Sequence, residues 1–310
     1  MFQNFLTVAQ QVVILFILIA IGFIAERVRL LTEPAVEVLT GLVLYLSVPA
    51  VIINSFQRSF DRSMLAGLGL AMLAALVIHA VLIALVSLIF RGTSSSDSRV
   101  QQFAVVFSNA GYMSLPLQRA ILGADGVFFG AAYIAVFNLV TWSYGIWRMS
   151  GDTKAISAKR LLFNPGLIGI AGGLAVFLLS ITLPPVISEP INYLAGLNTP
   201  LPMFIIGFYL SRTDLRAALR DRRSYGVAAL RLLVMPALVI GGMLLCGIGG
   251  PLLIAFSIAV SAPTAAATTM FAARFGGDAR LTELSVNLVS LTTLLAALTM
   301  PLMVMLAQSF

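Results

Sequence analysis

Residues 100–121 read VQQFAVVFSNAGYMSLPLQRAI, an apolar stretch long enough to cross a lipid bilayer. Its centre carries Ser108 and Asn109, residue types that make a helix tolerant of unwinding. A second stretch, 251–274, reads PLLIAFSIAVSAPTAAATTMFAAR and carries Pro263 at a similar depth. We predict that both helices are interrupted near the middle of the membrane. Because an interruption strands backbone polar groups in lipid, it is expected only where protein buries it or where it lines a polar cavity.

The composition of the whole chain places it in a membrane. Of its 310 residues, 60% are hydrophobic and 10% are charged, whereas soluble domains have about 45–50% and about 25%. Nucleic acid is excluded as a partner, because the sequence has no basic run with interleaved aromatic residues. One cysteine, Cys246, and one histidine, His79, cannot supply the thiolate and imidazole ligands of a metal site, and we expect no cofactor.

Apolar runs separated by short polar segments predict ten membrane-spanning helices and no inserted soluble domain. Their expected bounds are 8–25, 36–54, 64–90, 100–121, 126–147, 165–182, 190–211, 225–248, 251–274 and 281–307. Fifteen of the nineteen Lys and Arg residues fall in the odd-numbered connections, and three fall in the even ones and the tails. Since cytoplasmic loops are enriched in these residues, both termini are expected on the outer, periplasmic face of the inner (plasma) membrane.

An internal repeat relates the two halves of the chain. A shift of 153 residues without gaps superposes Ser108 on Ser261 and Asp125 on Asp278, together with other scarce residue types. We therefore expect two five-helix repeats, 1–152 and 153–310. An odd number of helices inverts the second repeat relative to the first, which provides a physical route to alternating access.

The paired interruptions form the candidate binding site. The candidate substrate-binding residues there are Ser108, Asn109, Ser261, Pro263 and Thr264, and the candidate helix-breaking residues are Gly111, Pro116 and Pro263. Exposed amides at the amino ends of half-helices favour an anionic group. The alternative for each helix is an ordinary proline kink that neighbouring Ser and Thr residues satisfy; the pairing of two such breaks favours a site.

Three further polar residues lie within the spans and are added to the candidate site. His79 could relay protons or meet an anion, or be a hydrogen-bonded packing residue. Arg231 could reach back to the inner surface, or face a cavity and hold a carboxylate. Asn138 could bond to a neighbouring helix or line the cavity. No Asp or Glu lies at mid-depth, so the carboxylate relay of many proton and sodium carriers is missing.

The sixth span contains a G-x-x-x-G motif, Gly169 and Gly173. This motif allows two helices to approach closely. We interpret it as packing within the chain rather than as the seam of a homodimer, which remains a possible assembly.

Several stretches resemble the bacterial auxin efflux carrier family, which is related to the PIN carriers of plants and includes malate and malonate permeases. The matching stretches are VFSNAGYMSLPL (106–117), LGADG (122–126), VFNL (136–139), WSYG (142–145), Asn164-Pro165, Arg231-Leu232 with Pro236, and Ser261-Ala262-Pro263. Two positions depart from the family pattern: Ser114 stands where a glycine is usual, and Ser108 stands where plant members have proline. The identity of the substrate is therefore not inherited from the resemblance.

The resemblance implies an all-α fold of ten transmembrane helices, similar to that of sodium–proton antiporters and bile-acid symporters. Helices 1, 2, 6 and 7 would form a scaffold part, and helices 3–5 and 8–10 a transport part in which broken helices 4 and 9 cross. Substrate would bind at that crossing, at Ser108, Asn109 and Pro263.

The function expected from this sequence is that of a secondary carrier or uniporter, acting in efflux, for a small organic anion. An auxin-like aromatic carboxylate or a dicarboxylate would fit. The alternative is a channel or membrane receptor for a small organic acid. An enzyme is not expected, because the sequence lacks Gly-x-Ser-x-Gly and a pair of facing intramembrane acids. Besides the substrate, the partner expected is the lipid bilayer.

Overall fold

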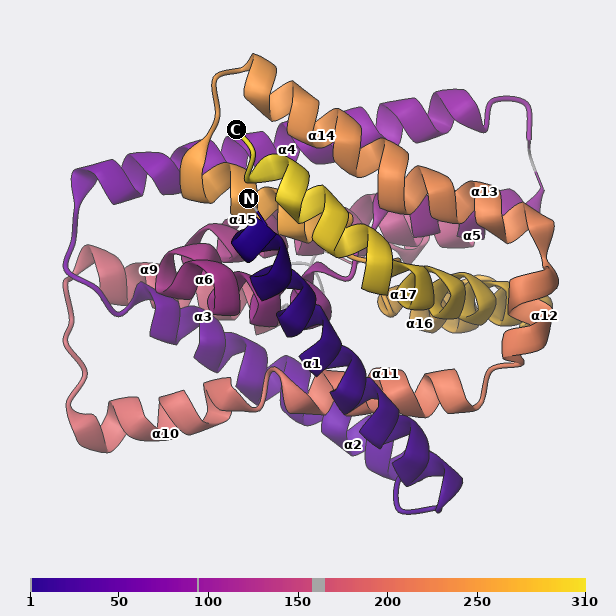
Figure 1. Cartoon of the computed structure of the whole chain (residues 1–310), viewed down its shortest axis with the longest axis horizontal. Coiled ribbons are helices and arrows are strands. Elements are labelled where there is room, and N and C mark those ends of the chain that lie inside the picture. Colours follow the sequence, from indigo (N-terminus) through magenta and orange to yellow (C-terminus); the bar gives the residue numbers. More distant parts are fainter. Residues whose placement is uncertain (1, 94, 158–164) are drawn as a thin grey trace.

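The computed structural model describes residues 2–93, 95–157 and 165–310, and these residues form a bundle of helices (Figure 1). Within these ranges there is no β-strand, and one isolated bridge joins Ser108 to Thr264. Asn164 of the Asn-Pro motif lies outside the described residues. Seven helical segments of the described chain are long and apolar enough to cross a membrane. The protein is thus an all-α, multi-pass membrane protein, as the composition predicts.

The first part of the chain contains seven α-helices and four short helical turns. The α-helices are α1 (Phe2–Arg27), α2 (Glu33–Leu42), α3 (Val48–Phe56), α4 (Arg62–Ile89), α5 (Ser96–Val106), α6 (Leu115–Val140) and α7 (Ile146–Ser150). Three π-helical turns, η1 (Val43–Ser47), η2 (Ala110–Ser114) and η3 (Thr141–Gly145), and one 3₁₀ turn, η4 (Thr153–Ala155), join or extend them.

The second part repeats this pattern of long and interrupted helices. Its elements are α9 (Pro165–Leu178), α10 (Pro185–Gly196), α11 (Pro200–Ser211), α12 (Leu215–Arg220), α13 (Arg222–Ala229), η5 (Leu230–Val234), α14 (Met235–Leu245), α15 (Gly250–Ser261), α16 (Ala267–Phe275) and α17 (Ala279–Ala307). The apolar helices α9 and α15 are shorter than the seven candidate spans.

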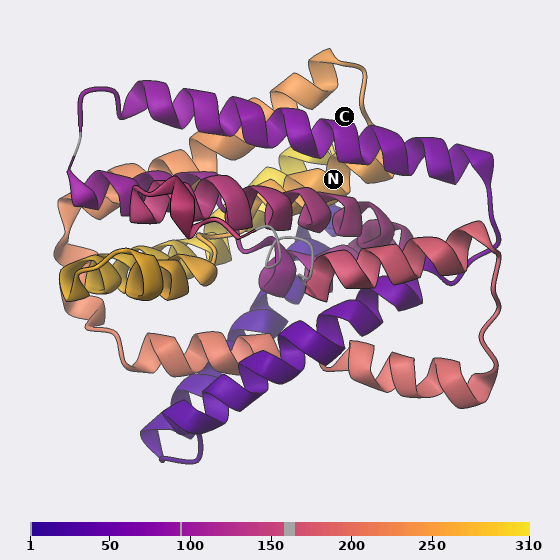
Figure 2. The same cartoon turned by 180° about the vertical axis from the view of Figure 1, so that it is seen from behind.

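The connections between helices gather at two ends of the bundle. The α1–α2, α4–α5 and α11–α12 connections lie at the right in Figure 1, and the α3–α4 and α9–α10 connections lie at the left; Figure 2 shows the same arrangement from behind. Carboxylates cap the helices that start there: Asp61 accepts from the Ser63 amide and Asp278 from the Arg280 amide. The hydrogen bonds from Ser63 lower the pKa of Asp61 below its usual value.

Proline explains three of the π-helical turns. Pro49, Pro116 and Pro236 each lie two residues after such a turn, η1, η2 and η5 respectively. Proline lacks an amide donor, and its ring clashes with the carbonyl one turn earlier in a regular α-helix. Widening that turn accommodates the ring, and π-turns of this kind are frequent at functional sites.

Small residues allow two pairs of helices to pack with their backbones in contact. A Cβ atom on Gly207 of α11 would collide with the Ile19 carbonyl oxygen of α1, and one on Gly169 of α9 would lie 2.9 Å from Cα of Pro49 in α3. Gly173 instead faces a side chain, because a Cβ atom there would lie 3.1 Å from the Phe56 ring of α3. The G-x-x-x-G motif therefore packs α9 against α3 within the chain.

Replacing Gly207 with alanine is expected to lower the thermal stability of the protein. The new methyl group would meet backbone rather than a movable side chain, and overpacking of this kind costs about 1–3 kcal/mol. Unfolding of the detergent-solubilised protein measures the effect. Gly242→Ala on α14, where nothing lies within 4 Å, is the matched control and should leave the melting temperature unchanged or raised. Equal losses in both variants would contradict close α1–α11 packing.

Candidate functional site

Two helices are interrupted, and the interruptions pair with each other. The first lies between α5 and η2, and the second lies between α15 and α16. The two linkers run antiparallel: the Asn109 amide donates to the Pro263 carbonyl at 2.7 Å, and the Ala265 amide donates to the Phe107 carbonyl at 2.9 Å. A short two-stranded crossing thus replaces the missing helical hydrogen bonds of both linkers.

The crossing differs in register from the sequence repeat. The 153-residue shift matches Ser108 with Ser261, whereas Ser108 pairs with Thr264 across the linkers. The helix-breaking residues are also distributed differently from the sequence expectation. Pro263 lies in its interruption, whereas Gly111 lies in the π-turn after the first interruption and Pro116 in the first turn of α6. The residues Phe107–Asn109 form the first interruption themselves.

Arg231 lies beside the crossing and is fully buried. Its Nη1 donates to the carbonyls of Val105 at 2.8 Å and Val106 at 3.3 Å, at the carboxyl end of α5. Its Nε donates to the Ala262 carbonyl at 3.3 Å, and its Nη2 donates to the Val260 carbonyl, both at the carboxyl end of α15. The side chain therefore points inward rather than toward the inner surface, and its partners are carbonyls.

The hydroxyl groups of the crossing divide into bonded and unbonded ones. The Thr264 hydroxyl donates to the Ala104 carbonyl at 3.1 Å, so its proton is not available to a ligand. Ser108 and Ser261 are fully buried, and their hydroxyls lack a hydrogen-bond partner among the described residues. Asn109 is 5% exposed, and the hydrogen bonds that it makes to described residues, with Pro263 and Met113, involve its main chain only. The Asn109 side chain is thus free to bind a ligand.

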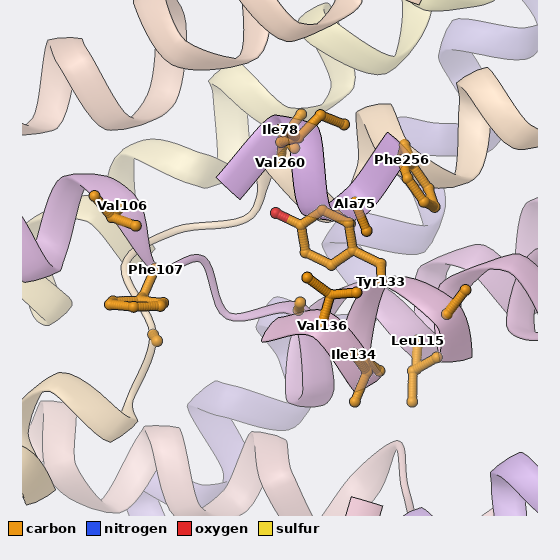
Figure 3. Close-up of a cluster of buried hydrophobic side chains, with 14 of the residues drawn as sticks. Ala75, Ile78, Val106, Phe107, Leu115, Tyr133, Ile134, Val136, Phe256 and Val260 are labelled. Carbon is orange, nitrogen blue, oxygen red and sulfur yellow. The ribbon is translucent and has the colours of Figure 1, made fainter. Parts of the chain in front are cut away.

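His79 and Tyr133 form a buried pair next to the crossing. The His79 ring bonds through Nδ1 to the Ala75 carbonyl at 2.8 Å, and its Nε2 has no partner among the described residues. The Tyr133 ring is tilted by 46° relative to the His79 ring, with 5.0 Å between the ring centroids. Its hydroxyl lies on the side of Ile78 and Val260 (Figure 3). That hydroxyl approaches the Ser108 side chain without a hydrogen bond of ordinary geometry.

Sequence reasoning did not single out Tyr133, because it lies in an apolar run with no helix breaker nearby. It also missed Thr293 of α17, a buried residue whose hydroxyl is unpartnered in the described part of the chain. Asn138 is half-buried near the end of α6, and its carbonyl accepts from the Thr141 amide. Among the described residues, its side chain makes no hydrogen bond to the crossing linkers.

A cavity of about 220 Å³ lies between α1 and the first turns of α6. Gln11 and Leu15 line it from α1, Pro116 and Arg119 line it from α6, and Thr199 completes it. Arg119 is exposed, so its positively charged side chain is accessible at this cavity. Among the described residues, no three His, Cys, Asp or Glu side chains gather to hold a metal ion.

Three relatives are similar to this chain along much of its length. A protein of Methanothermobacter thermautotrophicus named as an uncharacterized transporter is 26% identical over 310 residues, covering 96% of this chain and 98% of its own. A protein of Rhizobium meliloti, described as a candidate malonate transporter, is 24% identical over 270 residues, covering 84% of each chain. An uncharacterized transporter of Methanocaldococcus jannaschii is 25% identical over 218 residues, covering 66% of this chain and 70% of its own.

A family described as membrane transport proteins matches residues 7–304, which is nearly the whole chain. This match confirms the resemblance to auxin efflux carriers that the Ser-Asn-Ala-Gly stretch indicates. The chain belongs to this family of membrane transport proteins, and it is a transporter.

Proposed function

We propose that the protein is a carrier that moves a small organic anion by alternating access at the crossing of its two interrupted helices. The single observation that supports this proposal is the antiparallel pairing of the Phe107–Asn109 linker with the linker around Pro263. Discontinuous helices that meet near the membrane midplane are a common binding architecture of secondary carriers.

The charge at the crossing favours an anion. At the amino ends of η2 and α16, the amides of Gly111 and Ala267 have no carbonyl one turn earlier within their own helices, whereas the amides of Ala110, Thr268 and Thr269 donate to linker carbonyls. Such ends attract negative groups. Arg231 offsets the negative carboxyl ends of α5 and α15, and it makes no ion pair with an acid in the described chain. A carboxylate is the substrate group that fits, as in a dicarboxylate such as malonate or in an auxin-like aromatic carboxylate. Efflux is the direction that the family name suggests.

Helix packing supports ten spans in two inverted repeats, 1–152 and 153–310. The segment Ala110–Ser150 has 41 residues, twice what one crossing needs at about 1.5 Å per residue. Gly123, with a φ of +64°, interrupts α6 inside this segment, and we place the boundary between the proposed fourth and fifth spans there. The first span, which is α1, packs on α11 of the seventh span. The sixth span, which is α9, packs on α3 of the second span. Inverted repeats would produce this exchange of partners.

The same packing supports a scaffold part and a transport part. The helices α1, α2–α3, α9 and α10–α11 contact one another closely, whereas α6 packs mainly against α4 and α15. The Arg58–Asp125 ion pair, 2.7 Å between Nη1 and Oδ1, links the connection that follows α3 of the first group to α6 of the second. Rocking or elevator-like displacement of the transport part against the scaffold would expose the crossing to each side in turn.

Orientation in the inner membrane follows from the loop charges. The first half of α1 packs against the last half of α17, through Val8, Val12 and Val304, so both termini lie at the same end of the bundle. Most of the cations lie in the connections at the other end. We propose that both termini face the periplasm.

Uptake into proteoliposomes is the test of this function. We expect saturable uptake of radiolabelled malonate or indole-3-acetate and none of the corresponding amides, which lack the charge. Binding without flux would indicate a receptor, and non-saturating currents would indicate a channel. Either outcome, or flux of no organic anion, would contradict the proposed carrier.

Asn109→Ala is expected to raise the KM for the anion, while the protein stays folded, because the hydrogen bonds of Asn109 use its main chain. Loss of one hydrogen bond to a charged group costs about 1.5–3 kcal/mol, which is roughly tenfold or more in affinity. Asn192→Ala on α10 is the matched control and should change neither KM nor the melting temperature. An unchanged KM in Asn109→Ala would remove the crossing from the account of binding.

A further inference from the structure

The carbonyl groups at the two helix interruptions are accounted for almost completely by the chain itself. Ala104 accepts from Thr264, and Phe107 accepts from Ala265. Arg231 supplies donors to four further carbonyls, which are those of Val105, Val106, Val260 and Ala262. One side chain thus joins the carboxyl ends of two half-helices that are more than 150 residues apart in sequence.

A charge in this position carries a large desolvation penalty unless it is compensated. No acidic side chain pairs with Arg231 in the described part of the chain, and the acids that do form ion pairs, such as Glu33, Asp97 and Asp125, lie at helix ends. The compensation comes instead from helix carboxyl ends, each of which carries about half a negative charge. Two such ends together balance roughly one guanidinium.

The backbone near Arg231 aims the side chain at this point. Arg231 lies in the π-turn η5, which precedes Pro236 in the following turn. A π-turn displaces the side chain from the direction that a regular helix would give it. His79 of α4 and Tyr133 of α6 lie near the guanidinium on neighbouring helices.

We propose that Arg231 is the positioning residue of the substrate site: a permanent internal cation that holds the carboxyl ends of α5 and α15 together and leaves the amino ends of η2 and α16 to the anion. This inference rests on the proposed function. Four carbonyl oxygens that converge on one point are also the ligands that a monovalent metal cation takes in transport proteins. Arg231 therefore occupies the position in which a coupling cation would otherwise bind, and the wild-type carrier needs none.

A cation-dependence experiment on the full chain tests this role. Malonate uptake into proteoliposomes is measured in choline, sodium, potassium and guanidinium chloride for the wild type, Arg231→Ala and Arg231→Lys. Arg62→Ala, at the exposed start of α4, is the control for loss of an arginine outside the site. The melting temperature of each variant is measured in the same four salts.

We expect wild-type and Arg62→Ala uptake to be equal in all four salts. In choline, uptake by Arg231→Ala should be roughly tenfold or more below that of the wild type, because even one charge-assisted hydrogen bond contributes a free energy that corresponds to about a tenfold change. Sodium, potassium or guanidinium should restore part of it by filling the emptied carbonyl cage. Arg231→Lys keeps the charge but has one nitrogen for four carbonyls, so its uptake should be reduced in all salts without a dependence on the cation.

Two results would overturn the inference without affecting the proposed function: wild-type uptake that rises with sodium or potassium, or Arg231→Ala uptake equal to the wild type in choline. If no organic anion is transported, the proposed function fails, and the melting temperatures still test the role of Arg231. In that case, the role of Arg231 would be contradicted if no monovalent cation raises the melting temperature of Arg231→Ala. If Arg231→Ala does not fold, the role would be contradicted by an Arg231→Lys variant whose melting temperature rises with added cations.

Discussion

The constraint on which this structure depends is that backbone carbonyls in a membrane must be satisfied without water. A regular helix meets this constraint by itself, but α5 and α15 stop inside the bundle and leave carbonyls at their carboxyl ends. Arg231 and the opposite linker supply the missing donors. The interruptions are therefore possible only as a pair, and only beside the helix that carries Arg231.

The remaining features of the fold keep this pair in place and leave room for it to move. Close backbone contacts at Gly207 and Gly169 join the helices of the proposed scaffold part. The contacts between that group and the interrupted helices include the surface ion pair of Arg58 and Asp125. Exposed pairs of this kind contribute at most about 1 kcal/mol. Most of this boundary is apolar packing, because the buried rings of Phe56 and Phe177 contact Phe128 of α6 across it.

Much of this arrangement could be predicted from the sequence, because lipid imposes simple rules on composition. Long apolar runs indicated an all-helical membrane protein, and the polar centre around Ser108 and Asn109 indicated where a helix stops. The partner of Arg231 could not be predicted, because a sequence pattern gives the depth of a side chain but not the direction that a π-turn gives it. The same holds for Tyr133, whose apolar neighbours conceal its unpartnered hydroxyl. The three-residue difference in register at the crossing also needs coordinates, since Pro263 has no proline counterpart at the matching position.

A cryo-EM structure of the protein in lipid nanodiscs with saturating malonate would test the central claim most directly. The account predicts density for a carboxylate at the crossing, within hydrogen-bond distance of the Asn109 side chain and the first amides of α16, with Arg231 still bound to its four carbonyls. Density for malonate away from the crossing, or a carboxylate bound to a guanidinium that has left those carbonyls, would contradict it.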